Sequence, residues 1–374
     1  MAPSSAAWRA APRRTSRRRP LLPLSAAYFF GHLVVPSQQA PSPSMFVDVD
    51  ALPKSESLAD GFRVSLVRPP HEAANSGQKM LVNVSSMNLL EADEIAVLDA
   101  YDDLFEKYSL FCNGRWLGAQ VLQDSQDLMY MQHIVFMKKP DVIIETGTYK
   151  GGLTYFFSSL LEWTDPSKVA QIVSVDVHHP DLVYAANWFC PVCADCIRPY
   201  ETDVWARRVR FVQGHADSEE VYHQILNHMY DTAAMHFMDP ETGGVLSREE
   251  VEGRGGLGPN VKLDVDRSKT ILVNLDANHE FEGLLKELLF YAPLVTENSY
   301  LIVQDTKLDK IWGSPGPTAA LERFLSISPE GEFVLEPELK FHAYSQHTYL
   351  RRAKVTVHYT FFWERMLALS AAGA

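Results

Sequence analysis

The chain has 374 residues, of which 46% are hydrophobic and 22% are charged, and these proportions exclude a generally disordered, collagen-like or coiled-coil protein. A formal net charge of −13 does not attract phosphate backbones, so we expect no nucleic-acid partner. No apolar run reaches the roughly 18 residues that a membrane-spanning helix needs. The composition therefore predicts a globular protein without a transmembrane span.

Residues 1–47 differ from the rest of the chain. They contain six Arg and no Asp or Glu, and an apolar stretch, Leu21–Val35, follows the arginines. This pattern is typical of a targeting segment, either an organellar (plastid or mitochondrial) transit peptide or a secretory signal. A disordered tail that carries no targeting signal is the alternative. We expect a soluble mature protein with a helical region at 48–139, the main domain at 140–362 and a tail at 363–374.

Two amphipathic segments precede the main domain. Residues 91–108 place Tyr101, Leu104 and other apolar side chains on one helical face. Residues 119–139 also have a helical pattern, which ends before Pro140. We therefore expect two N-terminal helices packed on the main domain.

From residue 140 onward, short apolar runs alternate with helical stretches. This alternation is typical of a Rossmann-like, doubly wound α/β domain, a mostly parallel sheet of about seven strands with helices on both faces. Two segments, 187–203 and 239–268, interrupt the alternation and are expected to be inserted loops. The expected strands are Val142–Ile144, Ile172–Val175, Val209–Val212, Ile271–Leu275 and Tyr300–Val303, and the helices between them include Leu153–Glu162, Ser218–Met235 and Phe281–Tyr291.

The first of these strands runs into a glycine-rich turn, Glu145-Thr146-Gly147-Thr148-Tyr149-Lys150-Gly151-Gly152. The dinucleotide pattern GxGxxG fails because Tyr149 stands at the second glycine, and the phosphate-loop pattern fails because Leu153 replaces the lysine. The remaining interpretation is an S-adenosylmethionine loop, in which an acidic strand end suits a ligand carrying an ammonium and a sulfonium. The candidate cofactor-binding residues here are Glu145, Gly147, Thr148 and Gly151; a purely structural turn is the alternative.

The next two strand ends carry further candidates for binding this cofactor. Asp176 ends the second strand, where a carboxylate can accept both ribose hydroxyls. Asp217 and Ser218 follow the third strand and could contact the adenine. Equally, Ser218 could simply start the following helix.

The fourth and fifth strands end in an oxygen-rich corner. Asp276 follows one strand, and Gln304 and Asp305 follow the other, which is a donor set that Mg²⁺ favours. His279 lies three residues after Asp276 and is a candidate general base for a substrate hydroxyl. A hydrogen-bonded structural histidine is the alternative.

Together these motifs resemble the cephalosporin hydroxylase / rhamnosyl O-methyltransferase family, a branch of the class I S-adenosylmethionine-dependent methyltransferases. The resemblance runs over about residues 115–352, and the ordered series of motifs is more specific than any one of them. The series comprises Trp116, Gly118, Asp127, Gln132, Lys139–Thr148, Leu275–His279, Tyr291–Val295, Ser299–Thr306, Gly316–Ala320, Phe324–Leu325 and Tyr349–Arg352.

The resemblance implies a sheet with a reversed last strand, S-adenosylmethionine at the first two strand tips and Mg²⁺ beside the methyl acceptor. Glu145, Gly147, Asp176, Asp276, His279 and Asp305 fall on matching positions, whereas Gln304 departs because the family places an acid there. The implied function is O-methylation of a small molecule or a glycolipid sugar, with catalytic Asp276 and His279.

Two alternatives remain open: a cephalosporin-hydroxylase-like oxygenation component, and a non-catalytic S-adenosylmethionine-binding relative with a Ca²⁺-binding insert. The sequence does not identify the acceptor, and a homo-oligomer also stays open.

The first insertion contains Cys190, Cys193 and Cys196 in a CxxCxxC pattern. This spacing suggests a structural Zn²⁺ site whose fourth ligand would be Cys112, His178 or His179. Reduced or disulfide-paired cysteines are the alternative.

The second insertion contains a twelve-residue stretch, Asp239–Glu250, that resembles an EF-hand loop. Its Ca²⁺ ligands would be Asp239, Glu241, Ser247 and Glu250. Glu241 at the third position and Gly243 at the fifth depart from the pattern, and a polar turn is the alternative.

Overall fold

The computed structural model describes residues 92–355 with the exception of 168, 187–188, 192, 194, 257–260 and 336–348. The predicted targeting segment 1–47, residues 48–91 of the predicted helical region and the tail 363–374 lie outside the described residues. Within the described part, no helix has the length and apolarity required to cross a membrane.

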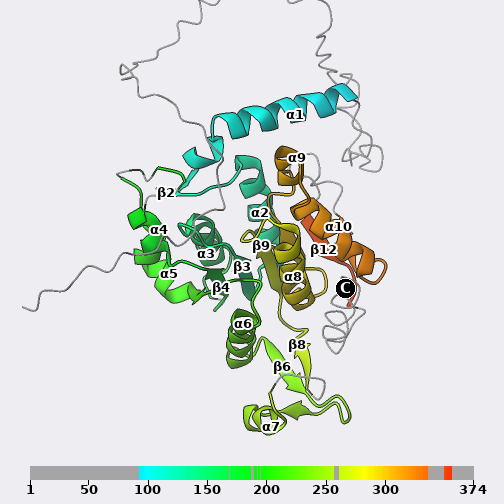
Figure 1. Ribbon diagram of the computed structural model, residues 1–374. Helices are drawn as coiled ribbons and strands as arrows, with labels where there is room; N and C mark the ends of the chain where they lie inside the picture. The colour runs from blue at the N-terminus through cyan, green and yellow to red at the C-terminus, as the bar shows by residue number, and fades with distance from the viewer. Residues whose placement is uncertain are drawn as a thin grey trace, which may run out of the picture. The chain divides into compact units, whose positions relative to one another are not determined.

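A seven-stranded sheet forms the centre of the described part (Figure 1). Its strands lie in the order β11-β12-β10-β9-β3-β4-β5, and β12 runs antiparallel to both of its neighbours while β3, β4, β5, β9 and β10 are parallel. The predicted mostly parallel sheet with one reversed strand is thus confirmed. The strands are β3 (Val142–Thr146), β4 (Gln171–Asp176), β5 (Val209–Gln213), β9 (Ile271–Leu275), β10 (Tyr300–Val303), β11 (Phe333–Leu335) and β12 (Tyr349–Arg352).

Helices cover both faces of this sheet, because successive side chains of each buried strand point to opposite sides. Ile143 packs in a core with α2 and α3, whereas Ile144 packs in a second core with α6, α8 and α10. The 3-10 helix η6 (Ala292–Leu294) follows α8 directly. The five packing helices are α2 (Ser125–Lys138), α3 (Gly152–Thr164), α6 (Glu219–Asp231), α8 (Phe281–Tyr291) and α10 (Pro317–Ile327).

The first predicted helix is confirmed as α1 (Ala92–Lys107), and the 3-10 helix η4 (Leu110–Asn113) follows it. The predicted helix 119–139 begins only with α2, at Ser125. Its first residues instead form a short hairpin of β1 (Arg115–Trp116) and β2 (Ala119–Gln120), turned by the positive φ angles of Leu117 and Gly118. A two-residue strand is too short to give a periodic signal, which is why the sequence pattern missed it.

The first insertion, 187–203, lies between α4 (Pro180–Ala186) and α5 (Asp203–Arg208) and contains the 3-10 helix η5 (Pro199–Glu201) after the cysteines. Disulfides join Cys112 to Cys190 and Cys193 to Cys196. The predicted zinc site on Cys190, Cys193 and Cys196 is therefore wrong, because a sulfur in a disulfide has no thiolate to offer a metal.

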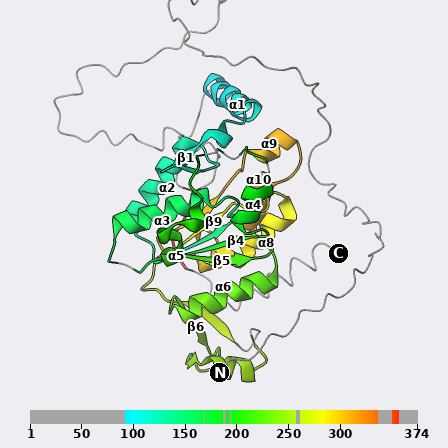
Figure 2. The same cartoon turned by 90° about the vertical axis from the view of Figure 1, so that its left-hand side faces the viewer.

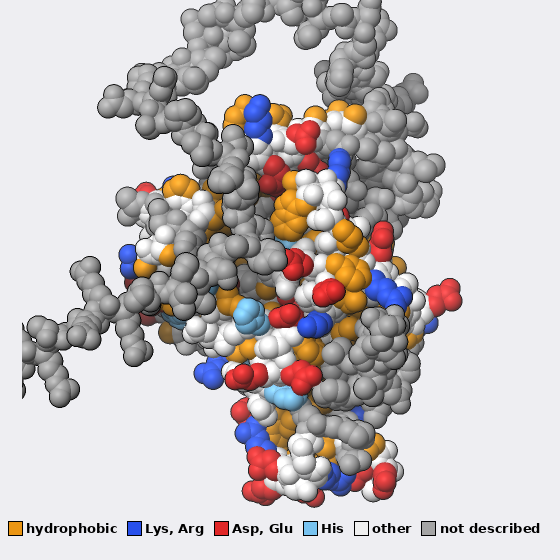
Figure 3. Space-filling view, in the orientation of Figure 1, with side chains coloured by type: hydrophobic (Ala, Val, Ile, Leu, Met, Phe, Trp, Pro, Cys, Tyr) orange, Lys and Arg blue, Asp and Glu red, His pale blue; other side chains and the backbone are white. Residues whose placement is uncertain are grey.

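The second insertion, 239–268, is not a loop: together with the strand just before it, it forms a small antiparallel sheet, and it also contains a helix (Figure 2). Strand β6 pairs with β7 on one side and with β8 on the other. In Figure 3 this region, at the lower end of the view, carries acidic and basic side chains side by side. Its elements are β6 (Met235–Met238), β7 (Val245–Leu246), α7 (Arg248–Gly253) and β8 (Lys262–Val265).

The side-chain contacts do not support the predicted calcium site in this insertion. The Asp239 carboxylate accepts hydrogen bonds from the backbone of Glu241 and pairs with the Arg254 guanidinium at 2.7 Å, so a cationic side chain stands where the ion would bind. Ser247 and Glu250 form a capping box at the start of α7. These residues serve local structure.

Candidate active site

The order in which the strands are added to the central sheet reverses between β3 and β9. From β3 the chain adds β4 and β5 on one side, and it later adds β9 and β10 on the other side. In α/β sheets, ligands bind at the carboxyl ends of strands beside such a point. Gly147, just after β3, has a φ of 84°, and a Cβ built there would lie 2.0 Å from the backbone oxygen of Asp276, just after β9. The glycine-rich turn therefore shares one edge of the sheet with Asp276, His279 and Asp305, which we call the acidic corner.

The glycine-rich turn is held in an unusual backbone conformation. Tyr149 has a φ of 48° and Gly151 a φ of 78°, and a Cβ on Gly151 would meet the Trp205 ring at 2.8 Å. The backbone N–H of Tyr149 donates to the Asp176 carboxylate at 2.7 Å, and that of His178 donates to its other oxygen at 3.1 Å. Asp176 is thus fixed at the tip of β4, half-buried, with free acceptor capacity on both oxygens.

Two of the predicted cofactor-binding side chains lie beneath this edge. Glu145 is fully buried and accepts hydrogen bonds from the hydroxyls of Thr154 and Ser174. The Thr148 hydroxyl is also buried and pairs with that of Ser174 at 2.6 Å. Burial raises the pKa of Glu145 to about 8, although the two hydroxyl hydrogen bonds oppose the shift. These side chains support the turn from below.

Asp217 and Ser218, the candidates after the third strand, differ in their surroundings. The Ser218 hydroxyl accepts a hydrogen bond from the backbone of Val221 at 3.3 Å, so it is the N-cap of α6. Asp217, beside it, is half-buried.

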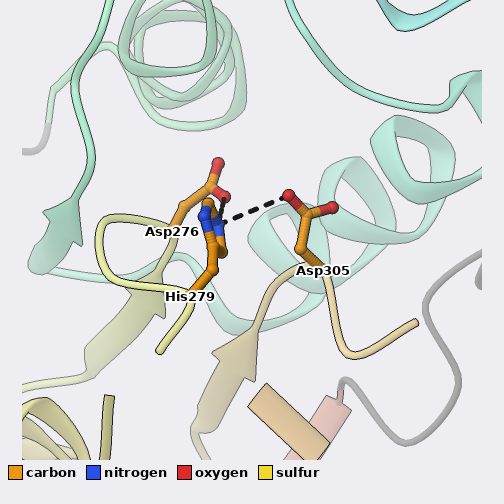
Figure 4. A group of neighbouring side chains, drawn as sticks. All are labelled: Asp276, His279 and Asp305. Atoms are coloured by element: carbon orange, nitrogen blue, oxygen red, sulfur yellow. Dashed lines mark ion pairs between the residues drawn. The ribbon is translucent and has the colours of Figure 1, made fainter. Parts of the chain in front are cut away.

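The acidic corner brings together Asp276, His279 and Asp305 (Figure 4). His279 lies between the two carboxylates, with its Nε2 atom 3.6 Å from Asp276 Oδ1 and 3.4 Å from Asp305 Oδ2. One ligand atom from each of the three lies within 4.8 Å of the others, a spacing that could hold a metal ion. Asp305 has a positive φ of 56°, a conformation that Asp tolerates better than most residues.

The charged groups of the acidic corner shift one another's pKa values. Burial opposes the charged form of His279, but its contact with Asp276 and the charge of Asp305 outweigh burial and raise the pKa of His279 to about 9. Burial raises the pKa of Asp276 to about 6, while His279 opposes the shift and Asp305 adds to it. Without further positive charge, the imidazole is therefore protonated at neutral pH.

Two glutamines flank the corner, and the sequence pointed to one of them. Gln304, a predicted Mg²⁺ ligand, is buried, and its amide nitrogen donates to the Asn274 side-chain oxygen at 2.8 Å. Gln123 was missed; its amide donates to Asp276 Oδ2 at 3.1 Å and so fixes the carboxylate. Gln123 lies in an irregular segment and had no spacing signal that could have revealed it.

Helix α9 (Leu308–Trp312) places apolar side chains at the same edge. The Trp312 ring centre lies 6.3 Å from that of His279, nearly perpendicular to it, and both Trp312 and Ile311 are exposed. The Asp309 carboxylate accepts the backbone N–H groups of Gly316 and Thr318, each at 2.8 Å, which anchors this segment to the start of α10. Sequence reasoning did not single out Trp312.

This sheet order, with its reversed strand, glycine-rich turn and acidic strand tips, defines a class I S-adenosylmethionine-dependent methyltransferase. The chain belongs to the rhamnosyl O-methyltransferase/CmcI family, whose sequence profile matches residues 107–234 and 259–353. The predicted family, fold class and enzyme class are thus confirmed.

Among similar proteins is the rhamnosyl O-methyltransferase of Mycobacterium leprae (strain TN), 23% identical over 255 residues that cover 66% of this chain and 85% of that protein. Among solved structures, CmcI with Mg and SAM is 14% identical with a TM-score of 0.39, and the match covers 64% of this chain and 77% of CmcI. A SAH-bound methyltransferase of Podospora anserina is 15% identical with a TM-score of 0.35, covering 67% of this chain and 93% of that one.

Proposed function

We propose that this protein transfers the methyl group of S-adenosylmethionine to a hydroxyl of a sugar-type acceptor, either a small molecule or a glycolipid, and that Mg²⁺ assists. The observation that carries the proposal is the cluster of Asp276, His279 and Asp305 at the same sheet edge as the glycine-rich turn. An acceptor hydroxyl beside His279 would face a donor held by the turn, and alignment of this kind accounts for much of the rate of such reactions.

The residues at the first two strand tips fit S-adenosylmethionine. When bound, this cofactor supplies an electrophilic methyl group on a positively charged sulfur. Asp176 has acceptor capacity for two ribose hydroxyls, and its charge and that of Asp276 suit a cationic ligand. Gly147 lets the backbone of the turn lie directly against the strand that carries Asp276.

The acidic corner fits a divalent cation. Within the described residues, the Nε2 atom of His279 is buried without a hydrogen-bond partner, and it faces two carboxylates. Asp276 and Asp305 would hold Mg²⁺, which supplies positive charge that lowers the pKa of an acceptor hydroxyl. The same charge would offset the pull of the carboxylates on His279, whose Nε2 atom could then take the hydroxyl proton.

The acceptor side of the corner suits a sugar ring. Trp312 and Ile311 offer apolar surface, against which the C–H face of a sugar can pack, next to groups that bind oxygen. The hydroxylase alternative has less support, since non-haem iron oxygenases bind iron with two histidines and one carboxylate. The cluster in the described residues has one histidine and two carboxylates.

Calorimetric binding of S-adenosylhomocysteine, followed by transfer of labelled methyl to p-nitrophenyl rhamnoside with Mg²⁺, tests this function. Replacing the proposed base, His279→Ala, should leave the Kd for S-adenosylhomocysteine within about threefold of the wild-type value and lower turnover by roughly 100-fold. His133→Ala, at an exposed position on α2, is the matched control and should remain active. If wild-type protein binds the nucleoside but methylates no member of a panel of hydroxylated acceptors, the non-catalytic alternative is correct instead.

A further inference from the structure

The glycine-rich turn contains a lysine whose charge is buried. Lys150 is only 1% exposed, and its ammonium donates to the Gln120 side-chain oxygen at 2.8 Å and to the backbone oxygen of Cys190. Among the described residues, no carboxylate forms an ion pair with it. A buried cation without a counter-ion depends on the fixed position of its neutral acceptors.

The disulfide between Cys112 and Cys190 sets the position of these acceptors. The Gln120 amide that faces Lys150 also donates to the backbone oxygen of Cys112 at 2.8 Å. The two cysteines, 78 residues apart, are joined covalently. Lys150, Gln120, Cys112 and Cys190 therefore form a closed ring of three hydrogen bonds and one disulfide, which we name the Lys150 junction.

The Lys150 junction lies against the part of the turn that orients Asp176. Lys150 directly follows Tyr149, whose backbone N–H holds the Asp176 carboxylate. The Lys150 ammonium also lies 5.3 Å from the centre of the Tyr149 ring and 5.9 Å from that of Tyr184. A shift of the Cys190 carbonyl would therefore move Lys150, and with it the peptide that fixes Asp176.

We propose that Lys150 is a positioning residue for the cofactor-binding turn and that the Cys112–Cys190 disulfide holds it in place, so that opening this disulfide weakens binding of the nucleoside. The acidic corner makes no contact with the Lys150 junction through these bonds, so the chemical step at saturating cofactor is unaffected. This inference rests on the placement of the cofactor at the turn proposed above.

The test uses the full chain with Cys193→Ser and Cys196→Ser, so that Cys112–Cys190 is the disulfide that remains. Its Kd for S-adenosylhomocysteine is measured by calorimetry before and after reduction by dithiothreitol, which gives two electrons and two protons to the S–S bond and is itself oxidised to a cyclic disulfide. Alkylation and mass spectrometry verify complete reduction. We expect the Kd to rise about tenfold.

Lys150→Met in the same background separates a positioning role from general stabilisation. This variant should bind about tenfold more weakly before reduction and should show no further change after it, because both perturbations act through one junction. An unchanged Kd on full reduction overturns the inference, as does a full response to reduction in Lys150→Met. If Lys150→Met does not fold, the reduction experiment alone decides. Absence of binding by the oxidised wild-type protein would instead refute the proposed function.

Discussion

Replacing Gly147 by alanine tests the close approach between the glycine-rich turn and the acidic corner. An alanine there carries two penalties. Its φ of 84° costs a residue with a Cβ about 1–2 kcal/mol. The new Cβ would also lie 2.0 Å from the backbone oxygen of Asp276, and a backbone group must move to relieve that contact. We expect the turn to shift and the affinity for S-adenosylhomocysteine to fall about 100-fold, which corresponds to about 3 kcal/mol.

Gly243→Ala provides a matched control for the backbone penalty. Gly243 has a φ of 69°, but nothing lies within 4 Å of a Cβ built there. Gly243→Ala should therefore lose about 1–2 kcal/mol of unfolding free energy in urea, whereas Gly147→Ala should lose more and should be the variant that binds poorly by calorimetry. Wild-type affinity in Gly147→Ala would refute the idea that this contact shapes the cofactor site.

Three further predictions concern the buried acid, the cation and the second insertion. Because the pKa of Glu145 rises to about 8 on folding, this residue should make the fold lose stability as pH rises from about 4.5 to 8, by about 3 kcal/mol at pH 7, and Glu145→Gln should remove that share of the pH dependence in urea titrations. Asp305→Asn should weaken Mg²⁺ binding about tenfold or more in calorimetry, with S-adenosylhomocysteine binding retained; unchanged Mg²⁺ affinity would count against this corner as the cation site. With Mg²⁺ present in excess to fill the acidic corner, millimolar Ca²⁺ should leave the melting temperature unchanged because Arg254 pairs with Asp239, and a clear further stabilisation by Ca²⁺ would contradict that assignment.

The regular part of the fold could be predicted from the sequence because buried strands and amphipathic helices leave strong patterns. The helix Phe281–Tyr291 has the predicted bounds, and all five predicted parallel strands are present. The β1–β2 hairpin and the small sheet of β6, β7 and β8 were missed, because these short strands are not continuous buried apolar runs, whereas β10, which also has four residues, is one.

The residues of the site that follow strand ends could be predicted from the sequence. The direction in which a strand side chain points, and contacts between segments far apart in the chain, were harder to predict. Asp276, His279 and Asp305 follow strands that are neighbours in the sheet, so their meeting could be expected from topology. Glu145 lies in β3, whose five residues are all buried, and the continuous apolar run that precedes it could have indicated its burial. The pairing of Cys112 with Cys190 joins segments 78 residues apart, for which one sequence carries no signal.

The turn between β6 and β7 offers a place to attach the enzyme to a surface. Glu241, Thr242 and Gly243 are exposed there, and no neighbouring atom restricts the space beside Gly243. In Figure 1 the small sheet that carries this turn lies at the opposite end of the domain from α9, which borders the acidic corner. A peptide tag or fluorophore inserted at this turn should be tolerated, as exposed glycine-containing loop tips usually are, and would leave the sheet edge that carries the acidic corner directed toward the solution.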